Sequence, residues 1–313
     1  MHQPGGVNVQ KRLGFPRALR ARTEASIRRG RLRLAGLLAA LVTFPAAALP
    51  TFAINPQPMP VEQPALWVLS DADTTVYLFG TFHALDERTD WFARNVRAAF
   101  DSSDELVLET IVPTDPAIVL GMIQRHSLAA PMVVGAPVVG NASGSFAASA
   151  GQAMVAGRSV GLTVERGADA VLRRIADAEG KPVDGLESFD FQLAMFANLP
   201  VAAPVPHHAA AAPRPAAAAT LADTRRMLLE MRSAWKRGDA SRFATVLGSL
   251  EAQSPTTYQR LFVDRNNHWA RWIAERMERP GTVFVAVGTG HLIGRDSLQH
   301  KLARHGLTAT RIN

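Results

Sequence analysis

The sequence predicts an α/β fold of the mixed α+β kind, in which two pseudo-symmetric halves share one cleft. Apolar strand segments alternate with helical segments along the chain, as expected of this class. Two of these strands run into Gly-Thr, one further residue and a histidine. The chain has 313 residues, 47% hydrophobic and 19% charged. This balance excludes fibrous, disordered and multi-span membrane classes.

The positive charge is confined to the N-terminus. Residues 1–33 hold nine basic side chains and one acid, a net charge of +8, whereas the whole chain carries +7. The other residues therefore sum to −1, which gives no electrostatic basis for binding nucleic acid. We expect no nucleic-acid partner.

An uncharged segment, Leu34–Ala48, follows the basic residues and ends in small side chains. This order is typical of a secretory signal, so residues 1–53 are predicted to be a leader and residues 54–64 a Pro-rich spacer. We expect an exported protein, periplasmic or secreted. The alternative is an uncleaved leader that anchors the chain in the inner membrane, in which case membrane contact runs through the leader alone. Several prolines make one long spanning helix unfavourable there.

Cysteine is absent from the sequence. The fold must therefore stand without disulfides, and a catalytic cysteine is excluded. Any metal ion would have to be held by His, Asp or Glu side chains.

The folded domain is predicted to span residues 65–313 and to begin with a β-hairpin. Ala65–Ser70 and Thr75–Phe79 read as strands across an Asp-Ala-Asp turn. Apolar residues at helical spacing predict a helix over 89–104, with Thr89 as its cap. Leu106–Leu108 then forms a short buried strand that ends at Glu109.

The middle of the chain is less regular. Residues 131–161 are rich in Gly, Ala, Ser and Val and fit short helices or an irregular excursion equally well. Ala168–Ala178 is predicted to be a helix, and Val183–Ser188 contains a strand that ends in Glu187. Residues 203–220 form an Ala/Pro-rich insertion, in which we interpret His207 and His208 as composition and not as a metal site.

The C-terminal part alternates helices and strands. The spacing predicts helices over Ala222–Lys236, Ala240–Ala252, Thr256–Met277 and Asp296–His305, and strands over Gly281–Val287 and Thr308–Ile312.

The two Gly-Thr-x-His motifs, Gly80-Thr81-Phe82-His83 and Gly288-Thr289-Gly290-His291, are the main functional feature. Glycine at a strand end lets the backbone approach a ligand, and the carboxyl ends of strands in α/β sheets line ligand crevices. We therefore expect His83 and His291 to face one cleft, with Gly80, Thr81, Gly288 and Thr289 against the substrate. The alternative is two unrelated strand-to-loop turns.

Three charged residues join this set. Glu109 and Glu187 each follow a short apolar stretch, so each carboxylate must be solvated, paired or bound to a cation. Arg265 lies on the apolar stripe of the helix predicted at 256–277, beside Asn266. It either reaches water along its stem, clamps one of the two glutamates, or binds a substrate carboxylate.

The segments YLFGTFH, LVLET, KPVDGLESFDFQL, DRNNHW and VAVGTGHLIGRDSL occur in this order. They resemble the TraB/GumN family, which includes the Tiki metalloproteases, from about Ala65 to the C-terminus. The resemblance implies an α/β fold with a pseudo-twofold arrangement and one cleft. It also implies that the cleft carries the following residues: His83, Glu109, Glu187, Arg265, Asn266 and His291. Two departures bear on the choice of substrate. Leu108-Glu109-Thr110 stands where family members often show Glu-Leu-Asp, so a second acid is missing there, and Asp264 stands where the family's Glu-Arg-Asn motif has its glutamate.

We therefore expect an exported, metal-dependent hydrolase of the peptidase type, acting on a peptide or protein. His83, Glu109 and His291 would hold a divalent ion (Mn, Co or Zn), which lowers the pKa of a bound water. Glu187 would complete the shell or take a proton, Arg265 would stabilise an oxyanion or hold a substrate carboxylate, and Asn266 would assist catalysis. A non-catalytic protein that binds a peptide or haem in the same cleft is the alternative, and an inactive scaffold is a third.

Overall fold

The computed structural model describes residues 62–126, 146–199 and 216–313, all of which belong to one unit, Gln57–Asn313. The predicted leader, most of the spacer and much of the two low-complexity segments lie outside the described residues. In the part that is described, no helix is long and apolar enough to cross a membrane.

A six-stranded mixed sheet forms the centre of the fold, with the order β4-β3-β5-β2-β1-β6. The strands are β1 (Leu66–Ser70), β2 (Thr74–Thr81), β3 (Glu105–Leu108), β4 (Val183–Gly185), β5 (Gly281–Gly288) and β6 (Thr310–Arg311). β1 and β2 form the predicted antiparallel hairpin, and β6 pairs with β1 at the edge. β2, β5, β3 and β4 all run parallel, so their carboxyl ends meet at one edge of the sheet.

The two motif strands are direct neighbours. β2 and β5 pair in parallel register, with Thr81 opposite Gly288. They are the two central strands of one sheet. The sequence instead suggested that each strand belongs to a separate half of the domain. Their outer neighbours differ in direction, because β1 is antiparallel to β2 whereas β3 is parallel to β5. The strand directions therefore do not follow the expected twofold relation.

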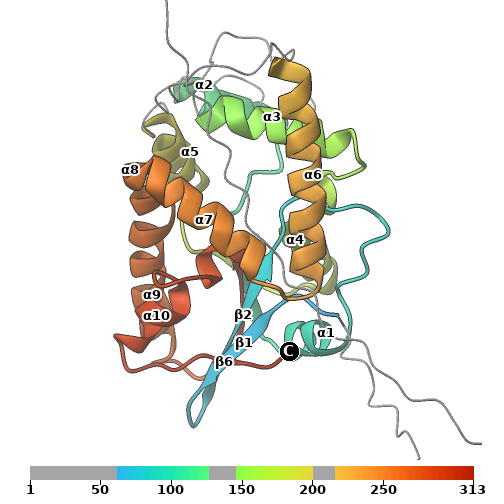
Figure 1. Cartoon of the computed structure of the whole chain (residues 1–313). Coiled ribbons are helices and arrows are strands. Elements are labelled where there is room, and N and C mark those ends of the chain that lie inside the picture. Colours follow the sequence, from blue (N-terminus) through green and yellow to red (C-terminus); the bar gives the residue numbers. More distant parts are fainter. Residues whose placement is uncertain (1–61, 127–145, 200–215) are drawn as a thin grey trace, which may run out of the picture. The chain divides into compact units, whose positions relative to one another are not determined.

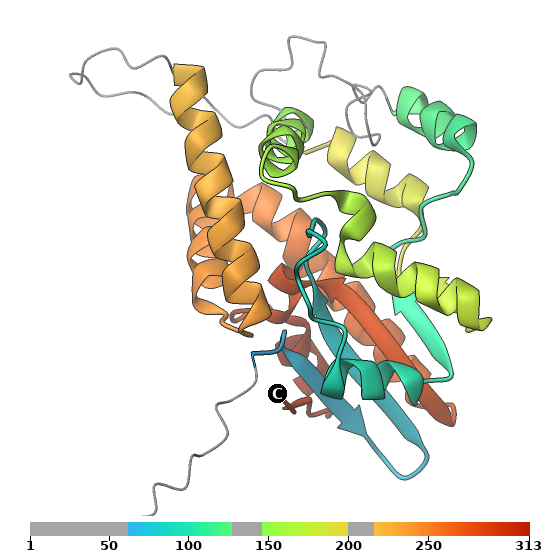
Figure 2. The same ribbon diagram turned by 90° about the vertical axis from the view of Figure 1, so that its right-hand side faces the viewer.

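Helices cover both faces of the sheet (Figures 1 and 2). They are α1 (Arg94–Asp101), α2 (Pro116–Arg125), α3 (Phe146–Arg158), α4 (Ala168–Glu179), α5 (Phe189–Ala197), α6 (Ala216–Lys236), α7 (Ser241–Gln253), α8 (Pro255–Tyr258), α9 (Asp264–Arg276) and α10 (Leu298–Ala303). Three short helical turns complete them: η2 (Val164–Arg166), the π-turn η3 (Gln259–Val263) and η4 (Thr289–Leu292).

Alternate residues of the central strands bury into two different cores. Phe79 and Phe284 pack with Phe100 of α1 and Trp235 of α6 on one face. On the other face, residues such as Val285 pack with α9 and α10. In Figure 1 these two helices lie to the left of the sheet and α1, α4 and α6 to its right. Burial on both faces explains why the strands are almost continuously apolar.

Three elements differ from their sequence-based ranges by more than two residues. The helix predicted at 89–104 begins only at Arg94, because Thr89 bonds to the Asp86 carboxylate at 2.5 Å and Trp91 turns into the core against Phe79. A π-turn interrupts the helix predicted at 256–277. Finally, α6 begins at Ala216, so the end of the predicted insertion is helical, as expected for an alanine run that contains no proline.

Candidate functional site

The carboxyl ends of the four parallel strands bring the predicted residues together. His83 follows β2, Glu109 follows β3, Glu187 follows β4, and His291 lies in η4 directly after β5. Arg265 enters from α9, which packs on this part of the sheet. Five side chains separated widely in sequence thus converge at one edge, as parallel strands require.

Arg265 lies at the centre of this group, with its side chain 6% exposed. Its Nε donates to both Glu187 oxygens at 3.0 and 3.1 Å, and Nη2 donates to Glu187 Oε1 at 2.5 Å and Glu109 Oε2 at 2.7 Å. Nη1 donates to His291 Nε2 at 3.0 Å and to the Leu261 carbonyl at 3.3 Å. A guanidinium has five N–H donors, and all of them are used here.

This pairing selects among the three interpretations of Arg265. The side chain does not reach for water, and it clamps both glutamates at once. Since every donor already has a protein acceptor, the group has no donor to spare for a substrate carboxylate or an oxyanion in this arrangement. The planar guanidinium also lies 4.5 Å from the Trp269 ring centroid, which adds a cation–π contact.

The two glutamates are enclosed. The Glu187 side chain is 4% exposed and the Glu109 side chain 12%. Glu109 Oε1 also accepts from the backbone N–H of Gly288 at 2.5 Å. Burial by itself would raise the pKa of Glu109, but the Arg265 charge, His83 and the Gly288 hydrogen bond hold that pKa well below its usual range. Glu109 is therefore an anion at neutral pH.

Hydrogen bonds define the tautomer of His291. Asn266 Nδ2 donates to the carbonyls of His291 and Asp296 at 3.1 and 2.8 Å, which turns its Oδ1 toward His291 Nδ1 at 2.7 Å. Because Arg265 can only donate, His291 Nε2 accepts and Nδ1 carries the proton. Burial, together with the positive charges of Arg265 and His83, lowers the pKa of His291 to about 3, against the opposing effect of Glu109. The ring is neutral.

The catalytic role expected of Asn266 stays a prediction, and the structure shows its contacts. Its side chain is 1% exposed and holds the His291 ring from behind. It is a positioning residue in this arrangement, buried away from any cleft.

His83 has a partner that sequence reasoning missed, Asp169. Asp169 Oδ1 lies 3.1 Å from His83 Nδ1. Partial desolvation of the ring would lower the pKa of His83, but the charge and hydrogen bond of Asp169 outweigh this effect and raise the pKa above its usual value. The His83 side chain is 59% exposed, so water screens the attraction. The signal in the sequence is slight, an acid in the first turn of α4.

The four residues expected against the substrate divide into two kinds. Gly288 does permit close approach, since a Cβ there would lie 3.0 Å from both Glu109 Oε1 and His83 Nε2. Gly80, Thr81 and Thr289 instead join the two motifs to each other. Thr289 Oγ1 donates to the Thr81 carbonyl at 2.8 Å, and a Cβ on Gly80 would lie 2.9 Å from Thr289 Oγ1. Contact of these three residues with a substrate stays a prediction.

The predicted metal ligands fit a divalent ion in kind and orientation. Both histidines are held through Nδ1 by an oxygen atom, as metal-ligating histidines commonly are. His83 Nε2 and Glu109 Oε1 face the same point above Gly288. Nevertheless, the described residues contain no group of three His, Asp or Glu side chains placed to hold a metal ion. Arg265 Nη1 lies at the His291 lone pair that an ion would use. Metal binding thus stays a prediction.

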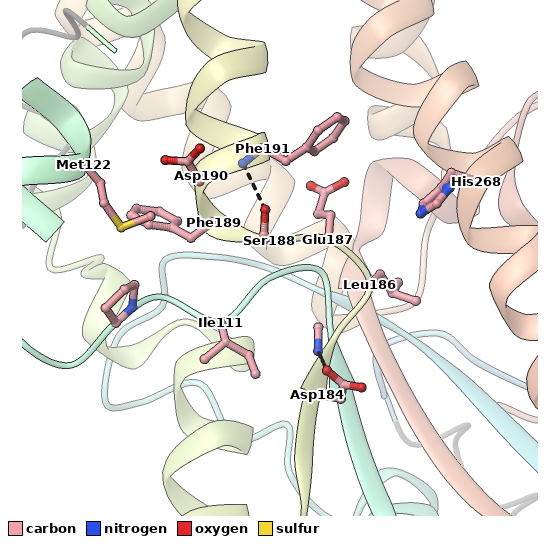
Figure 3. A pocket seen from close by; sticks show the side chains of 12 residues that line it. Ile111, Met122, Asp184, Leu186, Glu187, Ser188, Phe189, Asp190, Phe191 and His268 are labelled. Atoms are coloured by element: carbon pink, nitrogen blue, oxygen red, sulfur yellow. Dashed lines mark hydrogen bonds between the residues drawn. The ribbon is translucent and has the colours of Figure 1, made fainter. Parts of the chain in front are cut away.

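A cleft of about 730 Å³ opens beside Glu187 (Figure 3). Its walls are largely apolar and come from the loop after β3, from α2, from α5 and from the segment between β4 and α5; they include Ile111, Pro113, Met122, Leu186, Phe189 and Phe191. A second hollow of about 300 Å³ shares Glu187, Phe191 and His268 with the cleft and also touches Arg265. In Figure 3 the Glu187 carboxylate points into the space between Phe191 and His268.

Sequence reasoning did not find the residues that shape this cleft. Phe191 is 53% exposed, which is unusual for so large an apolar side chain on a structured helix. Only its position in the first turn of α5, shortly after β4 ends, could have singled it out, and that pattern alone is not specific.

Comparison with known proteins gives one result. The sequence model of the TraB/PrgY/gumN family matches residues 65–130 and 139–311. No curated protein and no solved structure matches the chain.

Proposed function

The chain belongs to the TraB/PrgY/gumN family, and from this membership together with the site we propose that it is an exported, metal-dependent hydrolase of peptide bonds. One observation carries the proposal. His83 Nε2 and Glu109 Oε1 face the same point, and His291 Nε2 lies 3.7 Å from that carboxylate oxygen. Two histidines and a carboxylate are a set that suits a divalent ion.

His83, Glu109 and His291 would hold the ion. When bound, a divalent ion supplies a water of lowered pKa and polarises a carbonyl group. Glu109 is kept ionised by Arg265 and by the Gly288 N–H, and His291 is kept neutral with Nε2 as its acceptor. Glu109 and His291 are thus in the protonation states that metal ligands require, whereas His83, whose pKa is raised by Asp169, would have to give up a proton when an ion binds.

We assign the remaining polar residues to positioning. Glu187 gives both of its oxygens to Arg265, so we assign it to holding the guanidinium in place. Asp169 orients His83 and Asn266 orients His291. The substrate would lie in the cleft of about 730 Å³, where apolar walls suit the side chains of a peptide.

Peptide capture without turnover is the second candidate. The Arg265–Glu187 pair, at 6% and 4% exposure, favours it, because these groups are enclosed and already paired with each other and so are not free to act on a bound peptide. The exposed Phe191 side chain would then contact the ligand directly.

Incubation of the purified protein with a mixed peptide library tests the proposal. Mass spectrometry should detect cleavage with Mn²⁺, Co²⁺ or Zn²⁺, and EDTA should abolish it. Glu109→Gln should be inactive because the amide is a poorer ligand, while Asn267→Ala, on the half-buried side of α9, should match the wild type. Peptides that bind but stay intact with all three ions would favour capture instead.

A further inference from the structure

We propose that Arg265 competes with a divalent cation for this site, so that an ion binds by displacing the Arg265 Nη1 donor from His291. The inference rests on the metal dependence proposed above and adds a regulatory role for this one side chain. It makes the arginine an internal cation that limits metal affinity.

The competition is localised at one atom. An imidazole nitrogen has a single lone pair, and that of His291 Nε2 accepts from Arg265 Nη1 at 3.0 Å. The same lone pair cannot also coordinate an ion. The Asn266 contact at Nδ1 prevents the ring from offering its other nitrogen. An ion can therefore gain His291 only if the guanidinium withdraws.

The Glu109 contact behaves differently. Arg265 Nη2 occupies Oε2, whereas Oε1 faces His83 and Gly288. An ion on Oε1 is compatible with the arginine on Oε2. His83 and Glu109 therefore remain available while Arg265 is in place, and His291 is the ligand that it withholds.

Charge adds to this effect. Glu109 and Glu187 place two buried carboxylates against one guanidinium, which leaves one net negative charge. Removing the guanidinium would leave the two buried carboxylates with only hydrogen bonds from the Gly288 N–H and the Gln192 amide, and without the charge that Arg265 supplies. Such an arrangement is costly until another cation replaces the guanidinium. The metal-free protein without Arg265 should be less stable, and a divalent ion should restore it.

The test compares metal binding by Arg265→Gln and Arg271→Gln with the wild type. Arg271 lies on the same helix, is exposed and loses the same charge, so it serves as the matched control. Calorimetric titration with Mn²⁺, Co²⁺ and Zn²⁺ gives the affinities. We expect Arg265→Gln to bind about tenfold to a hundredfold more tightly, because no charged hydrogen bond has to be broken. Arg271→Gln should match the wild type.

Thermal unfolding supplies a second readout. In EDTA, Arg265→Gln should have a lower melting temperature than the wild type. Added metal should raise the melting temperature of this variant by more than it raises that of the wild type. If this variant does not fold in EDTA, the double variant Glu187→Gln/Arg265→Gln removes one carboxylate together with the guanidinium and keeps the net charge of the group. It should show the same gain in affinity.

The opposite sign overturns the inference. If Arg265→Gln and the double variant Glu187→Gln/Arg265→Gln both bind the ion more weakly than the wild type, or do not bind it, Arg265 supports the site and does not compete for it. The hydrolysis assay of the wild type is independent of this result. A wild type that cleaves no peptide, together with a tighter-binding Arg265→Gln, would contradict the proposed function and leave the competition standing.

Discussion

Replacing Asn266 should destabilise the protein far more than replacing its neighbour Asn267. The Asn266 side chain is 1% exposed and makes three hydrogen bonds, two to the carbonyls of His291 and Asp296 and one from His291 Nδ1. Each contributes about 1 kcal/mol net, and a buried partner left unpaired is costly. Asn266→Ala should therefore lower the free energy of unfolding by about 3 kcal/mol.

Urea unfolding at pH 7, followed by far-UV circular dichroism, measures this change. In a protein of this size the loss corresponds to a fall in melting temperature of roughly 6–12 °C. Asn267→Ala is the control, because that side chain is only half-buried on the same turn of α9, and it should change stability by about 0.5 kcal/mol or less. If the two variants have the same stability, the hydrogen bonds that hold His291 contribute nothing measurable, and the argument for its fixed tautomer fails.

Three further predictions concern other parts of the chain. Gly288→Ala should lower the free energy of unfolding by about 1–3 kcal/mol and weaken metal binding in a calorimetric titration, because the added Cβ would crowd Glu109 and His83. The control is Gly248→Ala in α7, which should leave stability unchanged or raise it, because nothing lies within 4 Å of the added Cβ. Asp296→Asn should lower the free energy of unfolding by about 3 kcal/mol at pH 7, because the buried Lys301 ammonium loses its carboxylate partner. The pKa of Asp296 is lowered from 3.8: burial raises it, but Lys301 and Tyr258 outweigh this. The contribution of the ionised Asp296 carboxylate to stability is therefore complete above pH 3.8 and is lost as the pH falls through the folded-state pKa. Denaturant unfolding at pH 3 should accordingly show a smaller difference in the free energy of unfolding between the variant and the wild type. N-terminal sequencing of the exported protein should find a start between Leu49 and Ile54, and a soluble species that begins at Met1 would contradict export.

Local sequence was sufficient to predict most of the strands and the residues that gather at the site. Strand segments are recognisable because a strand buried on both faces is nearly all apolar, as in 283–287. The convergence of His83, Glu109, Glu187 and His291 follows from one rule, that the carboxyl ends of parallel strands share an edge. A position directly after a strand thus predicts a position in space.

Only the tertiary structure decided what these side chains do to one another. Arg265 could have met water, a substrate or either glutamate, and the packing of α9 on the sheet brings it to Glu109, Glu187 and His291 together. Asp169 reaches His83 across 86 positions of the chain, a contact that helical periodicity does not encode. Hydrophobic patterning specifies which face of an element is buried, but the direction of a charged side chain depends on which partners the finished fold places within hydrogen-bonding distance. For that reason the sequence predicts the members of this site, while the fold determines that an arginine contacts the His291 nitrogen that was expected to hold a metal ion.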